Sequence, residues 1–392
     1  MLIPNQAADG GTLTSLFRRA LAGCQLQPGE TVAVLSNAQS PPAYIDATAA
    51  AASTLGAKVF TVGLPSIQRA AGTVPGVGEV YGLTGLTDLG AAVAALKAVD
   101  LVVDLSVLLH SAEQEEILAA GTRMLMITEP PEILERMFPT DALRERVQNS
   151  VTLLGAAGEI AIRSDAGTDI TMGLGQFGSG GGWGFTSGPG THAHLASGLA
   201  AIYPNEGSAN GRWVIDAGDI IFPFKTYVQS PITCEVVNGF IVSITGPGAD
   251  AELYRDYLES WGDPEGFAMS HIGWGCNDRA RWNALALLDR SATQGMDGRC
   301  FAGNVLFSTG PNNEAGGSRF TLAHSDVPVR RHSVWLDGRQ ILDHGRFVVD
   351  ELAFDDGFAR LGAQPPATPA TPATPATPAA PAPAADDALV GA

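Results

Sequence analysis

The sequence predicts an α/β domain, then an α+β domain, then a tail without regular structure. Over residues 1–150, short apolar runs alternate with helical segments, which is typical of an open, largely parallel sheet with helices on its faces. Over residues 151–360, β-rich runs separated by turn residues predominate, which favours antiparallel strands. Residues 361–392 repeat Ala, Pro and Thr, a composition that cannot bury an apolar core and indicates a disordered tail.

Helices and strands alternate through the first of these domains. Amphipathic or Ala-rich composition predicts helices at 12–23, 43–54, 88–98 and 111–120. Apolar runs predict strands at 31–35, 58–62, 100–106 and 122–128. Neither a GxGxxG nor a GxxxxGK[ST] sequence accompanies these strands, so nucleotide binding is disfavoured. We expect this domain to act as a scaffold and in oligomerisation.

Turn residues mark hairpins in the second domain. Residues 159–172 predict two strands around an Asp-Ala-Gly turn. The Asn-Gly pair at 238–239 and the Asp-Gly pair at 337–338 lie between β-rich runs. Both dipeptides strongly favour the tight turn of a β-hairpin. Helical composition at 251–261 and 278–290 adds two helices. The domain is therefore predicted to be α+β and rich in antiparallel strands.

A glycine-crowded segment, 173–190, is predicted to be a loop. One interpretation is a mobile surface loop. The other is a lid over a site, with Trp183 and Phe185 as its apolar contacts.

Composition excludes several classes of partner. The chain has 392 residues, 45% of them hydrophobic, and a formal net charge of −18, so duplex nucleic acid and anionic membranes are poor partners. The first residues lack the apolar core of a signal peptide, and no apolar run is long enough for a membrane span. Four dispersed cysteines without CxxC spacing indicate reduced thiols and a cytoplasmic protein.

The sequence His324-Ser325-Asp326 is the strongest candidate for chemistry. In an extended strand, alternate side chains share a face, so His324 and Asp326 lie side by side. They supply two ligands of a 2-His-1-carboxylate site, which holds Fe(II) with open positions. His271, in the sequence SHIGWG, is the nearest strong candidate for the third ligand.

A second histidine pair competes for the metal. His192 and His194 also share a face if the backbone there is extended, and Glu206 follows as a carboxylate. Zinc bound by these three residues is a legitimate alternative, and periodicity does not choose between the pairs. Neither a GxSxG elbow nor an HExxH helix is present.

Five motifs carry a resemblance to a known family. They are HAHLASG at 192–198, YPNEGSANGR at 203–212, SHIGWGCNDRARW at 270–282, NVLFSTGPNNEAGG at 304–317 and HSDVP at 324–328. In these motifs the chain resembles the 2,5-dihydroxypyridine 5,6-dioxygenases of bacterial nicotinate catabolism. That family is related in fold to the M29-type thermophilic aminopeptidases, which bind two metals.

The resemblance implies a mononuclear iron site. Fe(II) is expected on His271, His324 and Asp326. The peptidases have a glutamate in place of His271 and a further histidine near 307–311, where this chain has Ser308. These differences separate the one-metal dioxygenase from the two-metal peptidase.

The implied reaction is extradiol-type cleavage of 2,5-dihydroxypyridine by O₂, which gives N-formylmaleamate. His110, which follows an apolar strand, and His194 resemble the acid/base positions of the family. Glu206 and Ser308 are expected to contact substrate or to support the ligands. His110 and His194 should lie near the open side of the metal, and the resemblance also implies a homo-oligomer. The alternatives are a dinuclear metalloaminopeptidase and a catalytically silent small-ligand-binding protein.

Overall fold

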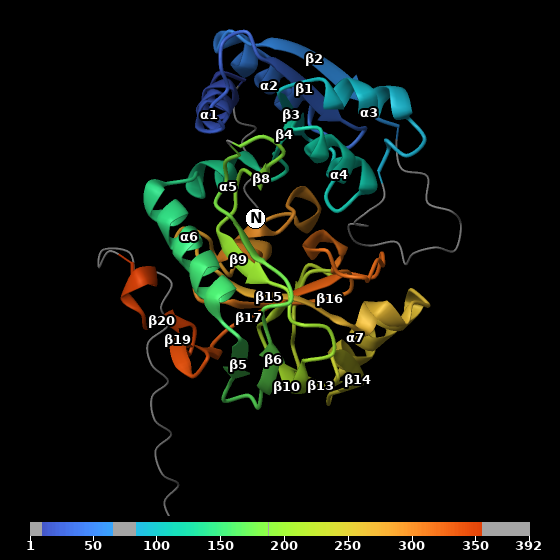
Figure 1. The fold of residues 1–392 in the computed structure, drawn as a ribbon, viewed down its shortest axis with the longest axis vertical. Helices are drawn as coiled ribbons and strands as arrows, with labels where there is room; N and C mark the ends of the chain where they lie inside the picture. The colour runs from blue at the N-terminus through green and yellow to red at the C-terminus, as the bar shows by residue number, and fades with distance from the viewer. Residues whose placement is uncertain (1–9, 66–83, 187, 355–392) are drawn as a thin grey trace, which may run out of the picture. The chain divides into compact units, whose positions relative to one another are not determined.

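The computed structural model describes residues 10–65, 84–186 and 188–354. The predicted tail at 361–392 lies outside the described residues. The described part is a mixed α/β fold that contains one parallel sheet and several antiparallel sheets (Figure 1). The predicted domain boundaries at 150 and 360 stay predictions. Within the described ranges, every helix is too short or too polar to cross a membrane.

The parallel sheet has the strand order β2-β1-β3-β4-β8 (Figure 1). Its strands are β1 (Thr31–Ser36), β2 (Lys58–Gly63), β3 (Leu101–Asp104), β4 (Arg123–Met126) and β8 (His192–His194). The helices that precede β5 are α1 (Gly10–Gly23), α2 (Pro42–Thr54), α3 (Gly90–Lys97), α4 (Ala112–Ala119), α5 (Pro131–Arg136) and α6 (Asp141–Ala156). The predicted strands and helices of this part are confirmed. Its last strand, β8, comes from beyond residue 150, and neither α5 nor α6 was predicted.

The central strands of this sheet are buried on both faces. In β1, Val32 and Val34 pack in a core with α1 and α2, whereas Ala33 and Leu35 pack in a second core with α3. This explains why the strands read as continuous apolar runs rather than as alternating ones. The two cores fix the sheet rigidly, and with it the loops at the carboxyl ends of β3 and β4.

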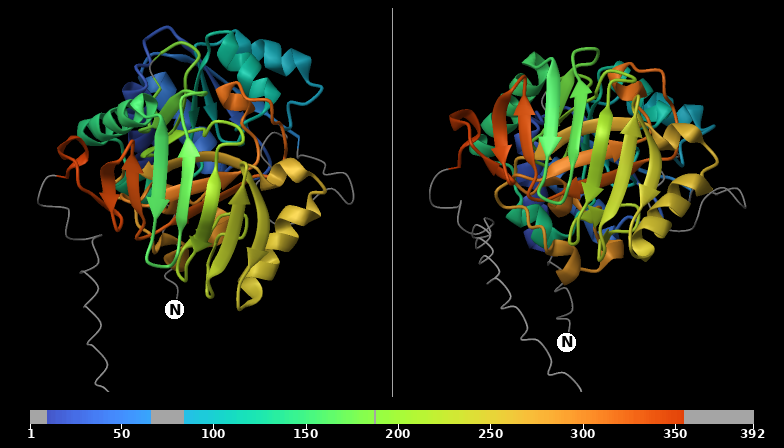
Figure 2. Two further views of the ribbon diagram at one scale, coloured as in Figure 1. Left: turned by 60° about the horizontal axis from the view of Figure 1, so that its bottom comes forward. Right: turned by 90° about the horizontal axis from the view of Figure 1, so that it is seen from below.

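Two antiparallel sheets pack face to face in the rest of the fold (Figure 2). The larger has the order β14-β13-β10-β6-β5-β18-β19-β20, and its strands are β5 (Glu159–Arg163), β6 (Asp169–Gly173), β10 (Asn210–Ile215), β13 (Ile232–Val237), β14 (Phe240–Thr245), β18 (Ser333–Leu336), β19 (Arg339–Asp343) and β20 (Arg346–Phe347). The smaller has the order β17-β16-β15-β9-β7, and its strands are β7 (Ser179–Gly182), β9 (Leu199–Ile202), β15 (Met269–Gly275), β16 (Val305–Thr309) and β17 (Ser325–Val329). Trp213 on β10 stacks on Phe307 on β16, with ring centroids 4.7 Å apart, so one core joins the two sheets.

The remaining elements are short apart from one helix. They are β11 (Ile220–Ile221), β12 (Thr226–Tyr227), α7 (Ala249–Ser260), α8 (Ala284–Leu287), α9 (Met296–Cys300) and the 3₁₀ helices η1 (Pro264–Phe267), η2 (Arg290–Ala292), η3 (Asn313–Ala315) and η4 (Asp350–Leu352). Helix α7, predicted at 251–261, is confirmed and packs on β13 and β14 (Figure 2).

The predicted hairpins are present. Asn238 and Gly239 join β13 to β14 with φ values of 50° and 84°, and Asp337 and Gly338 join β18 to β19 with 46° and 82°. Two successive positive φ angles are typical of the type I′ turn, which Asn-Gly and Asp-Gly favour. The two strands predicted at 159–172 are also confirmed, as β5 and β6.

The prediction of a helix over 278–290 is wrong. Only α8 and the single turn η2 form there. Tertiary hydrogen bonds hold the segment in a different path: the Arg281 N–H donates to Asp297 Oδ1 (2.6 Å), and the Trp282 carbonyl accepts from the Tyr227 hydroxyl (2.7 Å). These bonds outweigh the modest helix propensity of the segment.

The glycine-crowded segment is not a free loop, which corrects the prediction for 173–190. It contains β7, which pairs with β9. A Cβ on Gly181 would lie 2.7 Å from Val147 on α6, so glycine allows the helix to approach the strand closely. Trp183 and Phe185 pack edge to face, with ring centroids 5.2 Å apart, and both contact the cores of the protein.

Replacing Gly273 with alanine is expected to destabilise the protein by about 3 kcal/mol, the upper range for overpacking. A Cβ at Gly273 on β15 would lie 2.0 Å from the Ala200 carbonyl oxygen and 2.7 Å from Ala201 Cα. Urea unfolding measures the change. Gly180→Ala is the matched control, because a Cβ on this sheet glycine would meet nothing within 4 Å. Equal stability of the two variants would contradict the prediction.

Candidate metal centre

His271, His324 and Asp326 converge at the edge of the smaller antiparallel sheet. Their ligand atoms all lie within 4.8 Å of one another. Asp326 Oδ1 is 3.3 Å from His271 Nε2 and 3.4 Å from His324 Nε2. In the described residues, no other group of three or more His, Cys, Asp or Glu side chains converges in this way. The predicted convergence is therefore present, and the competing zinc group does not form.

Strand geometry explains how Asp326 reaches the centre. Asp326 on β17 lies opposite Ser308 on β16, while the next pair, Phe307 and Val327, enters the core. Alternation therefore sends the Asp326 side chain to the face opposite the core. His324 precedes β17, two residues before Asp326, so both side chains leave the strand on one side.

His271 lies within a β-bulge of β15. Met269 pairs with Thr309 and Ile272 pairs with Phe307, so three steps along β15 match two along β16. The extra residue lets both Met269 and Ile272 enter the core while His271 points to the other face. Bulges redirect side chains in this way at many functional sites.

Arg299 binds the carboxylate of this cluster. Its Nε donates to Asp326 Oδ2 at 2.7 Å, and its side chain is 8% exposed. Burial alone would raise the pKa of Asp326, but the neighbouring His324 and Arg299 hold that pKa well below its usual range. Asp326 is therefore an anion at neutral pH. The sequence analysis did not identify Arg299.

The donor set fits a divalent transition metal. Asp326 Oδ1 is buried and accepts no hydrogen bond from the residues that the structure describes. A buried carboxylate oxygen without a donor is costly, and a bound cation would satisfy it. Two imidazole nitrogens and one carboxylate oxygen form the set that non-haem Fe(II) oxygenases use.

His110 lies beside the cluster. Its ring centroid is 6.1 Å from that of His324, and its Nδ1 contacts Glu314 Oε1. Because a carboxylate only accepts, Nδ1 carries the proton of a neutral ring and Nε2 the lone pair. Burial, reinforced by the charges of His324 and His271, lowers the pKa of His110 well below its usual value. His110 is therefore neutral at physiological pH.

The loop that carries His110 is held by a buried acid. Asp104, at the end of β3, accepts hydrogen bonds from the N–H groups of Ser106, Val107 and Leu108 at 2.7–3.0 Å. Val107 and His110 have φ values of 67° and 63°, a conformation that is uncommon for non-glycine residues and most unfavourable for the β-branched Val107. The hydrogen bonds to Asp104 hold the start of the loop in this path.

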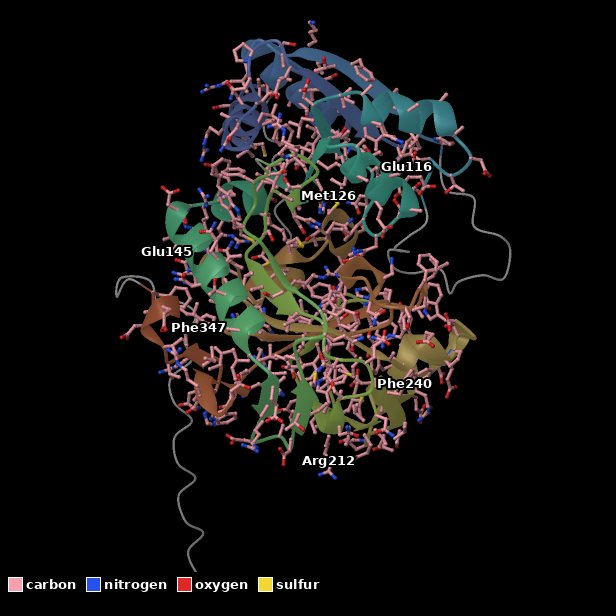
Figure 3. The ribbon with its side chains drawn as sticks, in the orientation of Figure 1. Glu116, Met126, Glu145, Arg212, Phe240 and Phe347 are labelled. Carbon is pink, nitrogen blue, oxygen red and sulfur yellow. The ribbon has the colours of Figure 1, made fainter. Side chains whose placement is uncertain are left out.

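His194 enters from the parallel sheet. It lies on β8 and pairs with Met126 on β4, which is labelled in Figure 3. Burial, together with the charges of His192, His110 and Arg299, lowers its pKa well below the usual value. Its buried Nδ1 has no hydrogen-bond partner in the described ranges. His194 therefore has a neutral ring with a nitrogen available to a ligand.

Ser308 and Glu206 differ in position. Ser308 faces Asp326 across the strands, and its buried Oγ makes no hydrogen bond to any described residue. Glu206 is not in the cluster. It accepts from Asn312 Nδ2 at 2.7 Å and from Ser318 Oγ at 3.2 Å, and the Asn312 bond leads the causes that lower its pKa.

Two further side chains near the centre were not predicted. The Tyr203 ring packs edge to face on His271, with centroids 5.8 Å apart, and its hydroxyl donates to Glu314 Oε2 at 3.1 Å. Glu314 in η3 thus links Tyr203 to His110. Arg212 on β10, labelled at the lower end of the molecule in Figure 3, pairs with Glu235.

Comparison with known proteins decides the family. A family model described as 2,5-dihydroxypyridine 5,6-dioxygenase matches residues 12–349. The chain belongs to this family. It is 44% identical over 339 residues to the 2,5-dihydroxypyridine 5,6-dioxygenase of Pseudomonas putida KT2440, covering 86% of this chain and 97% of the relative. The resemblance seen in the sequence is thereby confirmed.

Solved structures agree with membership of the 2,5-dihydroxypyridine 5,6-dioxygenase family. The structure of the dioxygenase from Pseudomonas putida KT2440 matches with a TM-score of 0.85 at 43% identity, over 88% of this chain and all of that one (100%). AmpT from Thermus thermophilus matches with a TM-score of 0.61 at 14% identity, over 86% of this chain and 99% of AmpT. The second match shows a shared fold, as the resemblance implied.

Proposed function

We propose that the protein is an Fe(II)-dependent, extradiol-type dioxygenase that converts 2,5-dihydroxypyridine and O₂ to N-formylmaleamate. The observation that carries the proposal is the convergence of His271, His324 and Asp326 in a chain 44% identical to a 2,5-dihydroxypyridine 5,6-dioxygenase. Both oxygen atoms of O₂ enter the product, so the reaction needs no external reductant.

His271, His324 and Asp326 would hold the iron. Bound Fe(II) would supply charge transfer from the electron-rich ring to O₂. Three protein donors leave open positions for the substrate and O₂. Asp326, kept ionised, partly neutralises the cation and limits its charge.

His110 is the proposed base that accepts the proton of the ring hydroxyl. A neutral imidazole can do so through its unprotonated nitrogen, and the contact of Nδ1 with Glu314 makes Nε2 that nitrogen. His194 is the second proposed acid/base group. It can return the proton as the ring opens.

Ser308 and Glu206 have proposed supporting roles. The Ser308 hydroxyl, buried opposite Asp326, can donate a hydrogen bond to substrate or O₂. Glu206 anchors Asn312 and Ser318, which flank Glu314 in the chain. It would therefore act on His110 indirectly, through the segment that carries Glu314.

Oxygen uptake tests the proposal directly. The protein is reconstituted anaerobically with Fe(II), and oxygen consumption is followed after addition of 2,5-dihydroxypyridine and a panel of other hydroxypyridines. We expect one iron per chain, consumption of one O₂ per substrate and formation of N-formylmaleamate. Uptake no greater than that of a His324→Ala variant would sink the substrate assignment.

The same experiment separates the alternatives. Two tightly bound divalent ions per chain would favour a dinuclear metalloaminopeptidase. Binding of hydroxypyridine without oxygen consumption, even with iron present, would favour a silent ligand-binding protein.

A further inference from the structure

Arg299 and Asp326 form a buried pair at the candidate centre. Each side chain is 8% exposed, and the Arg299 Nε to Asp326 Oδ2 distance is 2.7 Å. Asp326 therefore has one oxygen engaged by a cation and the other, Oδ1, facing both histidine Nε2 atoms. The two oxygens of one carboxylate have different surroundings.

We propose that Arg299 is a positioning residue that keeps Asp326 a one-oxygen ligand and thereby preserves an open position on the metal ion. The inference rests on the proposed function, because it concerns the same metal. A carboxylate can bind a metal through one oxygen or through both. With Oδ2 held by Arg299, only Oδ1 can serve as a donor.

The guanidinium is fixed from several sides. Its central carbon lies 3.9 Å from the Phe222 ring centroid, and NH1 donates to the Gln294 carbonyl. The Arg299 carbonyl in turn accepts from Asn304 Nδ2 at 2.9 Å. A planar donor packed in this way cannot follow a rotating carboxylate, so it restrains Asp326.

The helix that carries Arg299 is itself anchored to the parallel-sheet part of the fold. The Met296 N–H donates to buried Glu129 at 2.9 Å, and Asp297 accepts two hydrogen bonds from Arg136 at 2.6 and 2.7 Å. Helix α9 is thus held at its first two residues. Arg299 is therefore positioned by contacts with the parallel-sheet part of the fold as well as by its contact with Asp326 on β17.

Charge supports the same role. Arg299 offsets the negative charge of Asp326. A bound Fe(II) would therefore be less neutralised by its ligands and would attract the deprotonated substrate more strongly. Removing Arg299 would also free Oδ2 to bind the ion. Fe(II) would then bind no more weakly, but one position for substrate or O₂ would be lost.

The test measures metal binding and open positions separately. Apoprotein of wild type and Arg299→Met is titrated anaerobically with Fe(II) alone. Nitric oxide, which takes the place of O₂ and gives an electron paramagnetic resonance signal with Fe(II), is then titrated with and without 2,5-dihydroxypyridine. We expect the variant to bind Fe(II) at least as tightly as wild type. In the presence of substrate, its nitric oxide affinity should fall by about tenfold or more, because the second Asp326 oxygen would compete for the position that nitric oxide needs; supporting residues are typically worth about 10- to 100-fold in metal affinity or activity.

Arg330→Met is the matched control. Arg330 is also an arginine over an aromatic ring, with a side chain that is 15% exposed and a central carbon 4.1 Å from the Trp282 ring centroid, and it pairs with Asp219 at 3.6 Å. The Arg330→Met substitution should leave both Fe(II) affinity and nitric oxide affinity unchanged. Arg299→Lys, which keeps a charged N–H donor, should recover part of the nitric oxide binding.

Three results would overturn the proposal: loss of Fe(II) binding by Arg299→Met, unchanged nitric oxide binding in the presence of substrate, or a lysine variant no better than the methionine variant. A wild-type protein that binds no Fe(II) would instead refute the proposed function.

Discussion

Replacing His324 with alanine is expected to lower Fe(II) affinity by more than about 100-fold and to abolish oxygen uptake. Loss of a residue that supports a metal ligand typically costs about 10- to 100-fold in metal affinity or in activity, and loss of the ligand itself, which removes a donor atom, should cost more. His324 Nε2 lies 3.4 Å from Asp326 Oδ1, and without it two donors remain. Two donors hold a divalent ion weakly.

Anaerobic titration of the apoprotein with Fe(II) measures this loss. His344→Ala is the control, because His344 lies in the β19–β20 turn with a side chain that is 55% exposed. A thermal melt of both variants establishes that they are folded. Tight Fe(II) binding by the His324→Ala protein would show that the metal is held elsewhere.

Replacing His110 with asparagine is expected to lower kcat by about 100- to 10,000-fold, the usual contribution of a general base. Fe(II) affinity should stay close to that of wild type, because His110 is not one of the three residues whose ligand atoms converge. Asparagine is the appropriate replacement because His110 has a φ of 63°. Asparagine adopts this left-handed conformation readily, whereas alanine there costs about 1–2 kcal/mol.

Stopped-flow turnover and Fe(II) titration on the same protein separate these effects. His344→Asn controls for the substitution itself. If His110→Asn retained kcat within about tenfold of wild type, another group would be the base, since the loss would fall below the range of general-base catalysis. His194 would then be the next residue to replace.

Much of the fold could be predicted because local patterns and tertiary contacts agree. The central strands of the parallel sheet, β1, β3 and β4, are buried on both faces and have apolar sequences, and the turns at Asn238 and Asp337 follow from the φ preferences of Asn-Gly and Asp-Gly. The prediction of a helix at 278–290 failed because Asp297 and Tyr227, which lie outside this segment, form hydrogen bonds with its backbone groups.

The candidate centre could be predicted in part. His324 and Asp326 lie two residues apart, so strand periodicity alone placed them side by side. His271 was the nearest candidate for the third ligand, but the choice of this group over the one with His192 and His194 required a resemblance to known motifs. Arg299 and Glu314 have no such signal. Their importance depends on partners that only the folded chain brings near, as with most buried charges.

The bulge in β15 has a consequence for how such a centre could be transplanted. Alternation with Ile272 turns His271 away from the core, and the extra residue lets Met269 reach the core as well. On a regular strand with Ile272 in the core, Met269 would point to the same face as His271. Point substitutions change side chains but not chain length, so they cannot reproduce this packing. Grafting the three residues together with the packing of Met269 would therefore require an insertion in the recipient strand.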